Sequence, residues 1–225
     1  MPVLRILAGG AAQSLVEKAR PGFEIDGTFS AVGAMRDKLL AGEPADIVIL
    51  SRALVEELAR SGHVVASTIA DVAHVATAVA VRSGDPLPAI GDKAGLATAL
   101  AAADEIHFPD PGLATAGIHF AKVLKDLGIH GDVAARLHTA PNGATAMKAL
   151  AASTARRSVG CTQATEILST PGIVLVAPLP PGCALATVYT AAIGLKAEAT
   201  AEATRLLALL TGAAGREGRQ QLGFA

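Results

Sequence analysis

Small polar and glycine-rich turns recur along this chain wherever a short apolar segment gives way to an amphipathic one. If the apolar segments are strands and the amphipathic ones helices, each turn exposes the free N–H groups of a helix N-terminus. Those groups carry a partial positive charge, which suits a small anion. One such turn is ordinary βα geometry, so only their recurrence predicts an anion-binding crevice. The turns are Gly9-Gly10, Ser30 to Gly33, Ser51-Arg52, Thr115 to Gly117, Asn142-Gly143 and Thr162-Gln163.

Two arginines are placed where a fixed cation would help to hold an anion. Arg52 follows Ser51 at the end of an apolar segment, and Arg82 ends the apolar run from Val75 to Val81. Guanidinium groups are the preferred partners of carboxylates, although a lone surface arginine is the commoner case. The predicted ligand-binding residues are therefore Gly9, Gly10, Ser30, Ser51, Arg52, Arg82, Thr115, Asn142, Thr162 and Gln163.

Proton chemistry would need a different set of groups. His119 follows the Thr115 to Gly117 turn, where the N-terminal dipole of the predicted helix favours a neutral imidazole. It is the candidate general base if the protein is an enzyme, and a half-buried packing residue otherwise. Asp110, between two prolines, and Glu166, four residues after Thr162, are carboxylates that could face the same crevice. Cys161 lacks the spacing to a histidine that would favour a nucleophile.

Composition excludes several classes of protein. The net charge of −1 comes from 19 basic and 20 acidic residues spread along the chain, which argues against a nucleic-acid surface. The sequence holds no uninterrupted apolar run of the roughly 20 residues that a membrane span requires. Its two cysteines and six histidines show no metal-ligand spacing. We therefore expect no membrane insertion, no metal and no cofactor.

The order of segments predicts an α/β fold with a mostly parallel sheet and helices on both faces. The apolar runs 75–81 and 184–195 suit buried strands that cross between two lobes. We expect one lobe from residues 1–79 plus 188–225, a second from 80–187, and a ligand cleft between them. The expected strands are 3–8, 23–29, 47–50, 75–81, 106–108, 158–162 and 173–178; the expected helices are 11–19, 33–40, 53–60, a segment from 117 to a stop at Gly128, 144–152, 163–168 and 197–210, before a charged tail at 215–225.

Several stretches resemble the type II periplasmic binding protein superfamily, and within it the molybdate-binding proteins of bacterial ABC importers. They are Leu4-Arg-Ile-Leu-Ala-Gly-Gly-Ala-Ala12, the segment 33–49 with its Ala-Gly-Glu-Pro-Ala-Asp pattern, Val81-Arg-Ser-Gly-Asp-Pro-Leu-Pro88, Asp110-Pro-Gly-Leu-Ala-Thr-Ala-Gly117, Leu127-Gly128 and Gly223-Phe224. The resemblance implies two α/β lobes joined by crossover strands around a small anion, with an ABC permease as partner if the protein is exported.

The chain departs from that family at the turns that supply its hydroxyl ligands. It has Gly9 to Ala12, Ser30 to Gly33 and Cys161 to Gln163 in place of the family's serine-rich turns and Val-Tyr. This departure favours a carboxylate held by Arg52 or Arg82 and Gln163 over molybdate.

Three functions follow from these observations. The first is a substrate-binding protein that closes two lobes on a small anion, either a carboxylate or a molybdate-like oxyanion. The second is a cofactor-free isomerase, because some proteins similar to this family, notably aconitate isomerase, shift a double bond in a tricarboxylate. The third is a ligand-sensing module. The first residues show no secretory signal, so we expect a cytoplasmic protein, or a periplasmic one if a signal has been removed.

Overall fold

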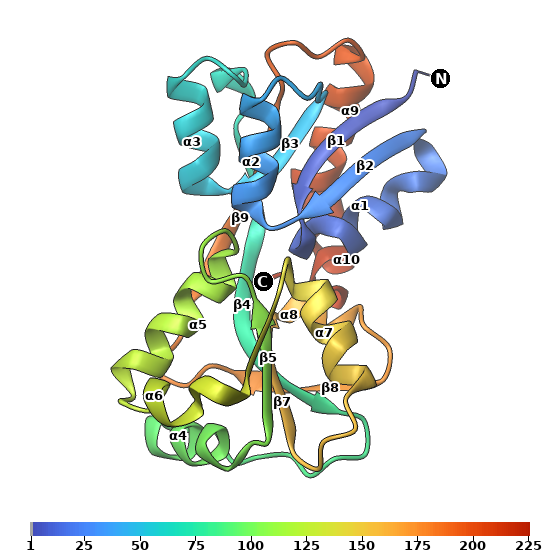
Figure 1. Cartoon of the computed structure of the whole chain (residues 1–225). Coiled ribbons are helices and arrows are strands. Elements are labelled where there is room, and N and C mark those ends of the chain that lie inside the picture. Colours follow the sequence, from blue (N-terminus) through green and yellow to red (C-terminus); the bar gives the residue numbers. More distant parts are fainter. Residues whose placement is uncertain (1) are drawn as a thin grey trace. The chain divides into compact units, whose positions relative to one another are not determined.

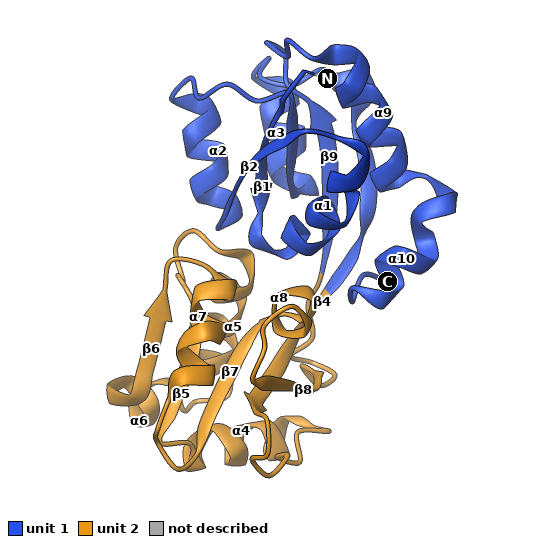
Figure 2. Ribbon diagram, turned by 90° about the vertical axis from the view of Figure 1, so that its right-hand side faces the viewer, with its two compact units in different colours: residues 1–75, 187–225 blue, residues 76–186 orange. Residues whose placement is uncertain are grey.

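The computed structural model describes residues 2–225 and divides into two compact units. Unit 1 holds residues 1–75 and 187–225, and unit 2 holds residues 76–186 (Figures 1 and 2). The chain passes from unit 1 to unit 2 within one long strand and returns near the start of the last strand. Each unit is an α/β structure with its own sheet.

Unit 1 contains three parallel strands in the order β2-β1-β3, with an antiparallel strand, β9, beside β3. Nearly every side chain of β1 and β3 is buried, as expected for parallel strands covered by helices on both faces. The strands are β1 (Leu4–Gly9), β2 (Ile25–Ser30), β3 (Ile47–Ser51) and β9 (Ala186–Ile193).

In unit 1, η1, α2 and α3 begin within two residues of the ends of β1, β2 and β3, where the sequence predicted turns. The helices of this unit are η1 (Gly10–Ala12), α1 (Gln13–Ala19), η2 (Arg20–Gly22), α2 (Val32–Leu40), α3 (Arg52–Arg60), η3 (Ala66–Thr68), α9 (Thr200–Thr211), η5 (Ala213–Gly215) and α10 (Arg216–Gln221).

The C-terminal segment is folded into unit 1, which corrects the expectation of a charged tail. Arg219 in α10 is buried, and its guanidinium donates to the carbonyl oxygens of Leu210 and Gly212. Phe224 is also buried. The backbone of Ala225 exchanges two hydrogen bonds with that of His74. Arg219 therefore satisfies carbonyl groups at the C-terminal end of α9, whereas Arg216 and Glu217 of the same segment are exposed.

Unit 2 has three parallel strands in the order β7-β5-β6, and β4 runs antiparallel to both β7 and β8. The predicted α/β fold is confirmed, and the sheets are mixed rather than purely parallel. The strands are β4 (Ala70–Arg82), which begins in unit 1, β5 (Glu105–Pro109), β6 (Leu137–Ala140), β7 (Ser158–Gln163) and β8 (Ile173–Pro178).

The helices of unit 2 cover both faces of its sheet (Figure 2). On one face Phe120 of α5 packs against Phe108 of β5. On the other face α7 lies against Gly160, where a Cβ would meet Met147 and Leu150. The helices are α4 (Lys93–Ala102), α5 (Thr115–Asp126), α6 (His130–Val133), η4 (Ala134–Arg136), α7 (Gly143–Ala152) and α8 (Ala164–Leu168).

The start of α5 depends on direct contact between helix and strand backbone. Gly117 lies in the first turn of α5, and a Cβ there would collide with the carbonyl oxygens of Pro109 and Asp110 at the end of β5. Backbone oxygens cannot move aside as a flexible side chain would. Glycine at this position therefore fixes how closely the helix N-terminus approaches the strand end.

Replacing Gly117 with alanine should lower the free energy of unfolding by about 1–3 kcal/mol, the usual cost of an overpacked site. Chemical denaturation measures it. Gly131→Ala is the matched control, because nothing lies within 4 Å of a Cβ at that helical glycine. Equal stability of the two variants would contradict the close contact.

Candidate anion-binding site

The predicted ligand residues of unit 1 lie at the carboxyl ends of its parallel strands. Gly9 and Ser30 are directly opposite each other in the register of β1 and β2, and Ser51 ends β3. The elements η1 and α3 begin immediately after Gly9 and Ser51, and α2 begins two residues after Ser30. The fold therefore gathers Gly9, Gly10, Ser30, Ser51 and Arg52 at one edge of the sheet (Figure 1).

The helices that start at this edge lack side-chain caps. In residues 2–225 no cap side chain accepts a hydrogen bond from the first turn of η1, α2 or α3, whose N-cap residues are Gly9, Ala31 and Ser51. Helix N-termini normally satisfy these N–H groups with a Ser, Thr, Asp or Asn side chain. The first turns here are therefore available donors with a favourable dipole.

Tyr189 is a component of this edge that the sequence did not reveal. A Cβ on Gly9 would lie 2.7 Å from Val32 Cγ1 and 3.0 Å from Tyr189 Cε1. Tyr189 is the single tyrosine of the chain, lies on β9 opposite Ser51 and is buried. Gly9 thus lets the chain pass beside this ring. Two signals could have identified it: it is a lone tyrosine within an apolar strand, and Val188-Tyr189 matches the Val-Tyr dipeptide of the resembled family.

Arg52 is engaged by a carboxylate of its own unit. Its guanidinium donates from Nε and Nη2 to the two carboxylate oxygens of Asp71, with an Nε–Oδ1 distance of 3.1 Å. Asp71 also accepts from Thr190 Oγ1 at 2.8 Å. The Arg52 side chain is 52% exposed, so its outer face still reaches solvent. An anion at Arg52 would share the guanidinium with Asp71 or displace it.

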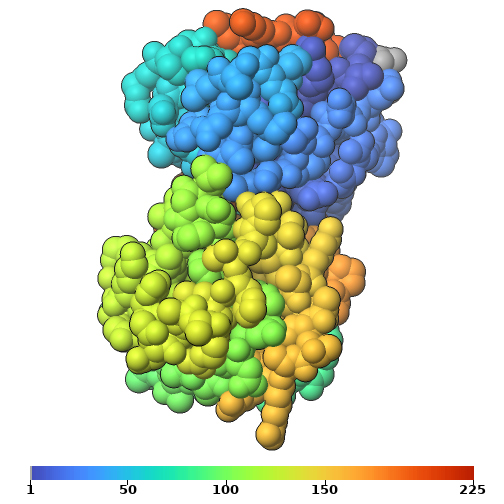
Figure 3. All heavy atoms as spheres, viewed as in Figure 1, coloured from blue at the N-terminus to red at the C-terminus, as the bar shows by residue number. Residues whose placement is uncertain are grey.

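The corresponding edge of unit 2 carries Thr115, Asn142, Thr162 and Gln163. Thr115 begins α5, which has no side-chain cap among the described residues. Asn142 caps α7, since its Oδ1 accepts from the Thr145 N–H at 2.8 Å. Thr162 and Gln163 end β7. The loops before α5 and α7 include exposed residues, and their green and yellow atoms lie at the surface of unit 2 in Figure 3.

Glu166 occupies the N-terminus of α7 with its own carboxylate. Its Oε2 accepts from Thr162 Oγ1 at 2.6 Å, and the carboxylate also receives the backbone N–H groups of Gly143, Ala144 and Gln163. A Cβ on Gly143 would collide with Glu166 Oε2 and Thr162 Oγ1, so glycine is required there. The Thr162 hydroxyl and the first turn of α7 are therefore committed to an internal anion.

The pKa of Glu166 reflects two opposing effects. Burial raises it to about 7, although the hydrogen bonds from Thr162 and three backbone N–H groups act in the other direction. The side chain is 5% exposed. Desolvation of the charged form is the larger effect, so protonated and ionised forms coexist near neutral pH.

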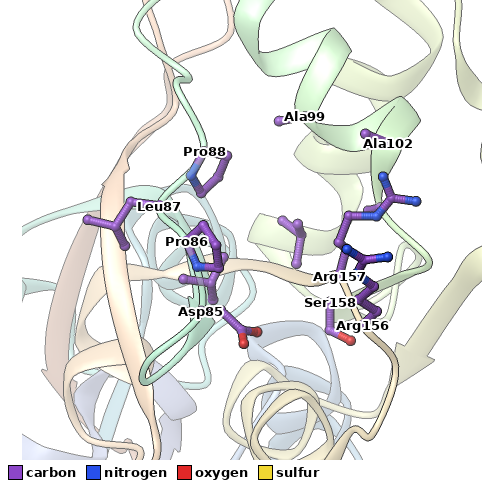
Figure 4. A pocket seen from close by; sticks show the side chains of 12 residues that line it. Asp85, Pro86, Leu87, Pro88, Ala99, Ala102, Arg156, Arg157 and Ser158 are labelled. Carbon is purple, nitrogen blue, oxygen red and sulfur yellow. The ribbon is translucent and has the colours of Figure 1, made fainter.

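Arg82 is not brought to this edge. It ends β4, which runs antiparallel to β7, and lies beyond Ala80, the partner of Gly160, whereas Thr77 pairs with Gln163. Its guanidinium donates to Asp85 and to the carbonyl oxygen of Ser153. A hollow of about 230 Å³ also lies at this far end, with Asp85, Arg156 and Arg157 in its wall (Figure 4). The expectation that Arg82 shares a site with Gln163 is therefore wrong. Because β4 runs antiparallel to β7, the carboxyl end of β4, where Arg82 lies, is beside the start of β7 and not beside Gln163 at its end.

His119 lies in the second turn of α5 with a fixed tautomer. Its Nε2 is 2.7 Å from the carbonyl oxygen of Cys183, which can only accept, so Nε2 carries the proton. Nδ1 is then the basic nitrogen. The ring is half-buried, which leaves room for solvent or a small molecule to approach.

The other candidate groups have structural roles. Asp110 Oδ1 accepts from the N–H groups of Gly112 and Leu113, which forms the turn before α5. Cys161 is fully buried, and burial raises the pKa of its thiol, so it is not an activated nucleophile. Residues 2–225 contain no cluster of three His, Cys, Asp or Glu side chains arranged to hold a metal. Within the same residues no helix is long and apolar enough to cross a bilayer.

Two mixed α/β units, with helix N-termini set at the carboxyl ends of parallel strands, define the periplasmic binding protein class of fold. The model of the family described as bacterial extracellular solute-binding protein matches residues 10–225, and the chain belongs to this family. The resemblance predicted from the sequence is thereby confirmed.

Solved structures and one curated relative are similar over nearly the whole chain. The periplasmic molybdate-binding protein of Azotobacter vinelandii is 17% identical with a TM-score of 0.80, covering 99% of this chain and 98% of that one. The sulfate-binding protein SubI of Mycobacterium tuberculosis is 16% identical with a TM-score of 0.78, covering 100% and 86%. Aconitate isomerase from a Pseudomonas species is 25% identical over 222 residues, covering 92% of this chain and 81% of the relative.

Replacing Glu166 with glutamine should change how stability depends on pH. The folded-state pKa of about 7 exceeds the ordinary value of 4.5, so the native protein binds this proton more tightly than the unfolded chain. The free energy of unfolding should therefore fall as pH rises from about 4.5 to about 7, and the variant should lose that decline. Denaturant titrations at several pH values measure it.

Glu17→Gln is the matched control for this experiment. Glu17 lies on α1, and a hydrogen bond from Arg20 holds its pKa below the ordinary value. Removing it should leave the decline between pH 4.5 and 7 in place. An unchanged decline in Glu166→Gln would show that Glu166 is ionised throughout.

Proposed function

We propose that this protein binds small anions, and that the donors within each unit are main-chain N–H groups at helix starts: those of α2 and α3 in unit 1, and that of α5 in unit 2. The observation that carries the proposal is that these helices begin at carboxyl ends of parallel strands without side-chain caps. By contrast, α4 and α7 are capped by Asp92 and Asn142. A side chain of the protein therefore accepts from the first turn of α4 and α7, but no N-cap side chain within residues 2–225 does so at α2, α3 or α5.

The names of similar proteins support an anionic solute. They include binding proteins for molybdate and sulfate and a protein solved with L-phospholactate bound. The family is described as an extracellular solute-binding protein, which supports a location outside the cytoplasmic membrane. Similar proteins named as parts of ABC transporters support an ABC-type permease as the partner.

We propose further that a di- or tricarboxylate binds more tightly than molybdate. Ala31 and Gly10 stand at turns where the resembled family carries serine, so hydroxyl donors for a tetrahedral oxyanion are few. Arg52 offers a charge-assisted donor, with Asp71 as the group that a carboxylate would replace. In unit 2, Gln163 carries an amide at the carboxyl end of β7, whereas Arg82 lies at the other end of that sheet.

Calorimetric titration with molybdate, sulfate, citrate and the two aconitate isomers tests both proposals. At least one carboxylate should bind, and more tightly than molybdate. Tight binding of molybdate alone would contradict the preference for carboxylates but keep anion binding. No heat with any of the five would contradict anion binding.

Thr115→Pro should weaken binding of the tightest of these anions by about tenfold or more. Proline is tolerated at the first position of a helix, and Ala114 already has an extended backbone, so the change removes one N–H donor with little effect on the fold. A hydrogen bond to a charged group contributes about 1.5–3 kcal/mol, and each 1.4 kcal/mol is a factor of ten.

Two variants control for this change. Lys93→Pro alters the same position of the capped helix α4 and should leave affinity unchanged. Thr115→Ala keeps the N–H and removes the hydroxyl, which separates the two groups. Equal affinity of Thr115→Pro and the native protein would show that α5 supplies no main-chain donor.

A second candidate function, cofactor-free isomerisation of a tricarboxylate, is favoured by similarity to a protein named aconitate isomerase. His119 Nδ1 would act as the general base, since Nε2 is bonded to the Cys183 carbonyl. The proton would leave the carbon next to a carboxylate group, and N–H donors would stabilise the enolate. The same donors that bind an anion would then serve the reaction.

His119→Ala should lower turnover by about 10²- to 10⁴-fold with a much smaller change in affinity, the usual effect of losing a general base. NMR detection of solvent deuterium entering cis- or trans-aconitate measures the reaction. No exchange in the native protein would leave binding alone as the function. Exchange unaffected by the variant would assign the base to another residue.

A further inference from the structure

Glu166 is a buried carboxylate surrounded by neutral groups. Its hydrogen-bond partners are the Thr162 hydroxyl and the backbone N–H groups of Gly143, Ala144 and Gln163. None of these partners carries a full charge. A buried carboxylate normally has a cation beside it, because desolvation disfavours an isolated charge.

The elements packed against Glu166 supply no cation. α8 packs against β8, α7 and β7. Within these described elements β8 has no ionisable residue, β7 has only Cys161, which pairs with Val79 on the opposite face of the sheet from Thr162, and α7 has only Lys148, which is exposed. The nearby loop carboxylate of Asp110 bonds to backbone N–H groups of its own turn. The negative charge of Glu166 is therefore balanced by dipoles alone.

The charge lies one hydrogen bond away from the proposed ligand residues. Glu166 bonds to the main chain of Gln163 and to Gly143, the neighbour of Asn142. Negative charge on Glu166 would repel an anion held beside these residues, and burial leaves little water to screen that repulsion. A neutral Glu166 would not oppose it.

Protonation requires no rearrangement of the site. Thr162 Oγ1 lies 2.6 Å from Glu166 Oε2. A hydroxyl can donate to a carboxylate or accept from a carboxylic acid, so the same contact serves both forms. The backbone N–H groups can remain on the other acceptor sites of the carboxyl group.

We propose that Glu166 couples anion binding to proton uptake: binding at the edge of unit 2 raises the protonated fraction of this carboxyl group, with the proton taken from solvent. The coupling rests on the proposed anion-binding function. It makes Glu166 a positioning and charge-setting residue, which tunes affinity with pH without touching the anion. The raised pKa of about 7 places this exchange near neutral pH.

Calorimetry of sulfate and trans-aconitate in buffers of different ionisation enthalpy tests the coupling; sulfate keeps a constant charge from pH 6 to 8.5, and proton uptake with trans-aconitate is corrected for the titration of that ligand. The native protein should take up a fraction of a proton per anion bound at about pH 7, and affinity should rise about tenfold from pH 8.5 to 6. Glu166→Gln, which is permanently neutral and close in shape, should take up no proton and bind at pH 8.5 as tightly as the native protein does at pH 6.

Two further variants separate a proton switch from a structural effect. Thr162→Val removes a donor to the charged form, so the midpoint of the affinity change should move to higher pH. Glu17→Gln, on α1 of unit 1, should keep the native pH profile. If a probe binds and Glu166→Gln has the same proton uptake and the same dependence of affinity on pH as the native protein, the coupling is overturned. If neither probe binds at any pH, the proposed function is overturned instead.

Discussion

Main-chain N–H groups in the first turn of a helix need a hydrogen-bond acceptor. In both units, the acceptors that the chain provides or omits decide which helix N-termini can bind a solute. The helices α2, α3, α5, α7 and α8 each follow the carboxyl end of a parallel strand in the chain. At α2, α3 and α5 the residue before the helix leaves the donors without a side-chain acceptor among residues 2–225. Gly9 and Gly117 allow the backbone to approach its neighbours closely at such turns. These features favour a solute that brings its own negative charge.

The start of α7 shows the same requirement met from within the chain. Asn142 caps the helix, and the carboxylate of Glu166 accepts from Gly143 and Ala144. The start of α7 therefore shows how a carboxylate binds a helix N-terminus in this chain, and it can be compared with the starts of α2, α3 and α5, where no side chain of the described residues caps the helix. It also places a titrating charge beside the proposed ligand residues. Anion recognition and proton binding are linked here because both use the donors of one helix N-terminus.

Local patterns in the sequence predicted the turns but not the partners of their charged residues. The spacing of apolar segments located β1, β3, β8 and the start of α7 to within a residue or two, because strand and helix periodicity is a local property. Arg52 meets Asp71, 19 residues away, and Arg82 contacts Ser153, 71 residues away; neither pairing has a local signal. Alanine-rich α4 shows little amphipathic pattern, which is why it was not predicted. The hydrogen bond between Thr162 at the end of β7 and Glu166 on α8 was not predicted either, because it crosses a strand–helix junction.

The most direct measurement of the central claim is the change in backbone amide chemical shifts when trans-aconitate or sulfate is added to ¹⁵N-labelled protein. Hydrogen bonds from main-chain N–H groups to a bound anion should shift the first-turn amides of α2, α3 and α5, including Val32, Ala53 and Thr115. The first turn of α4, which Asp92 caps, should not shift. Saturable binding with shifts confined to side-chain groups, or to helices outside this set, would contradict the account.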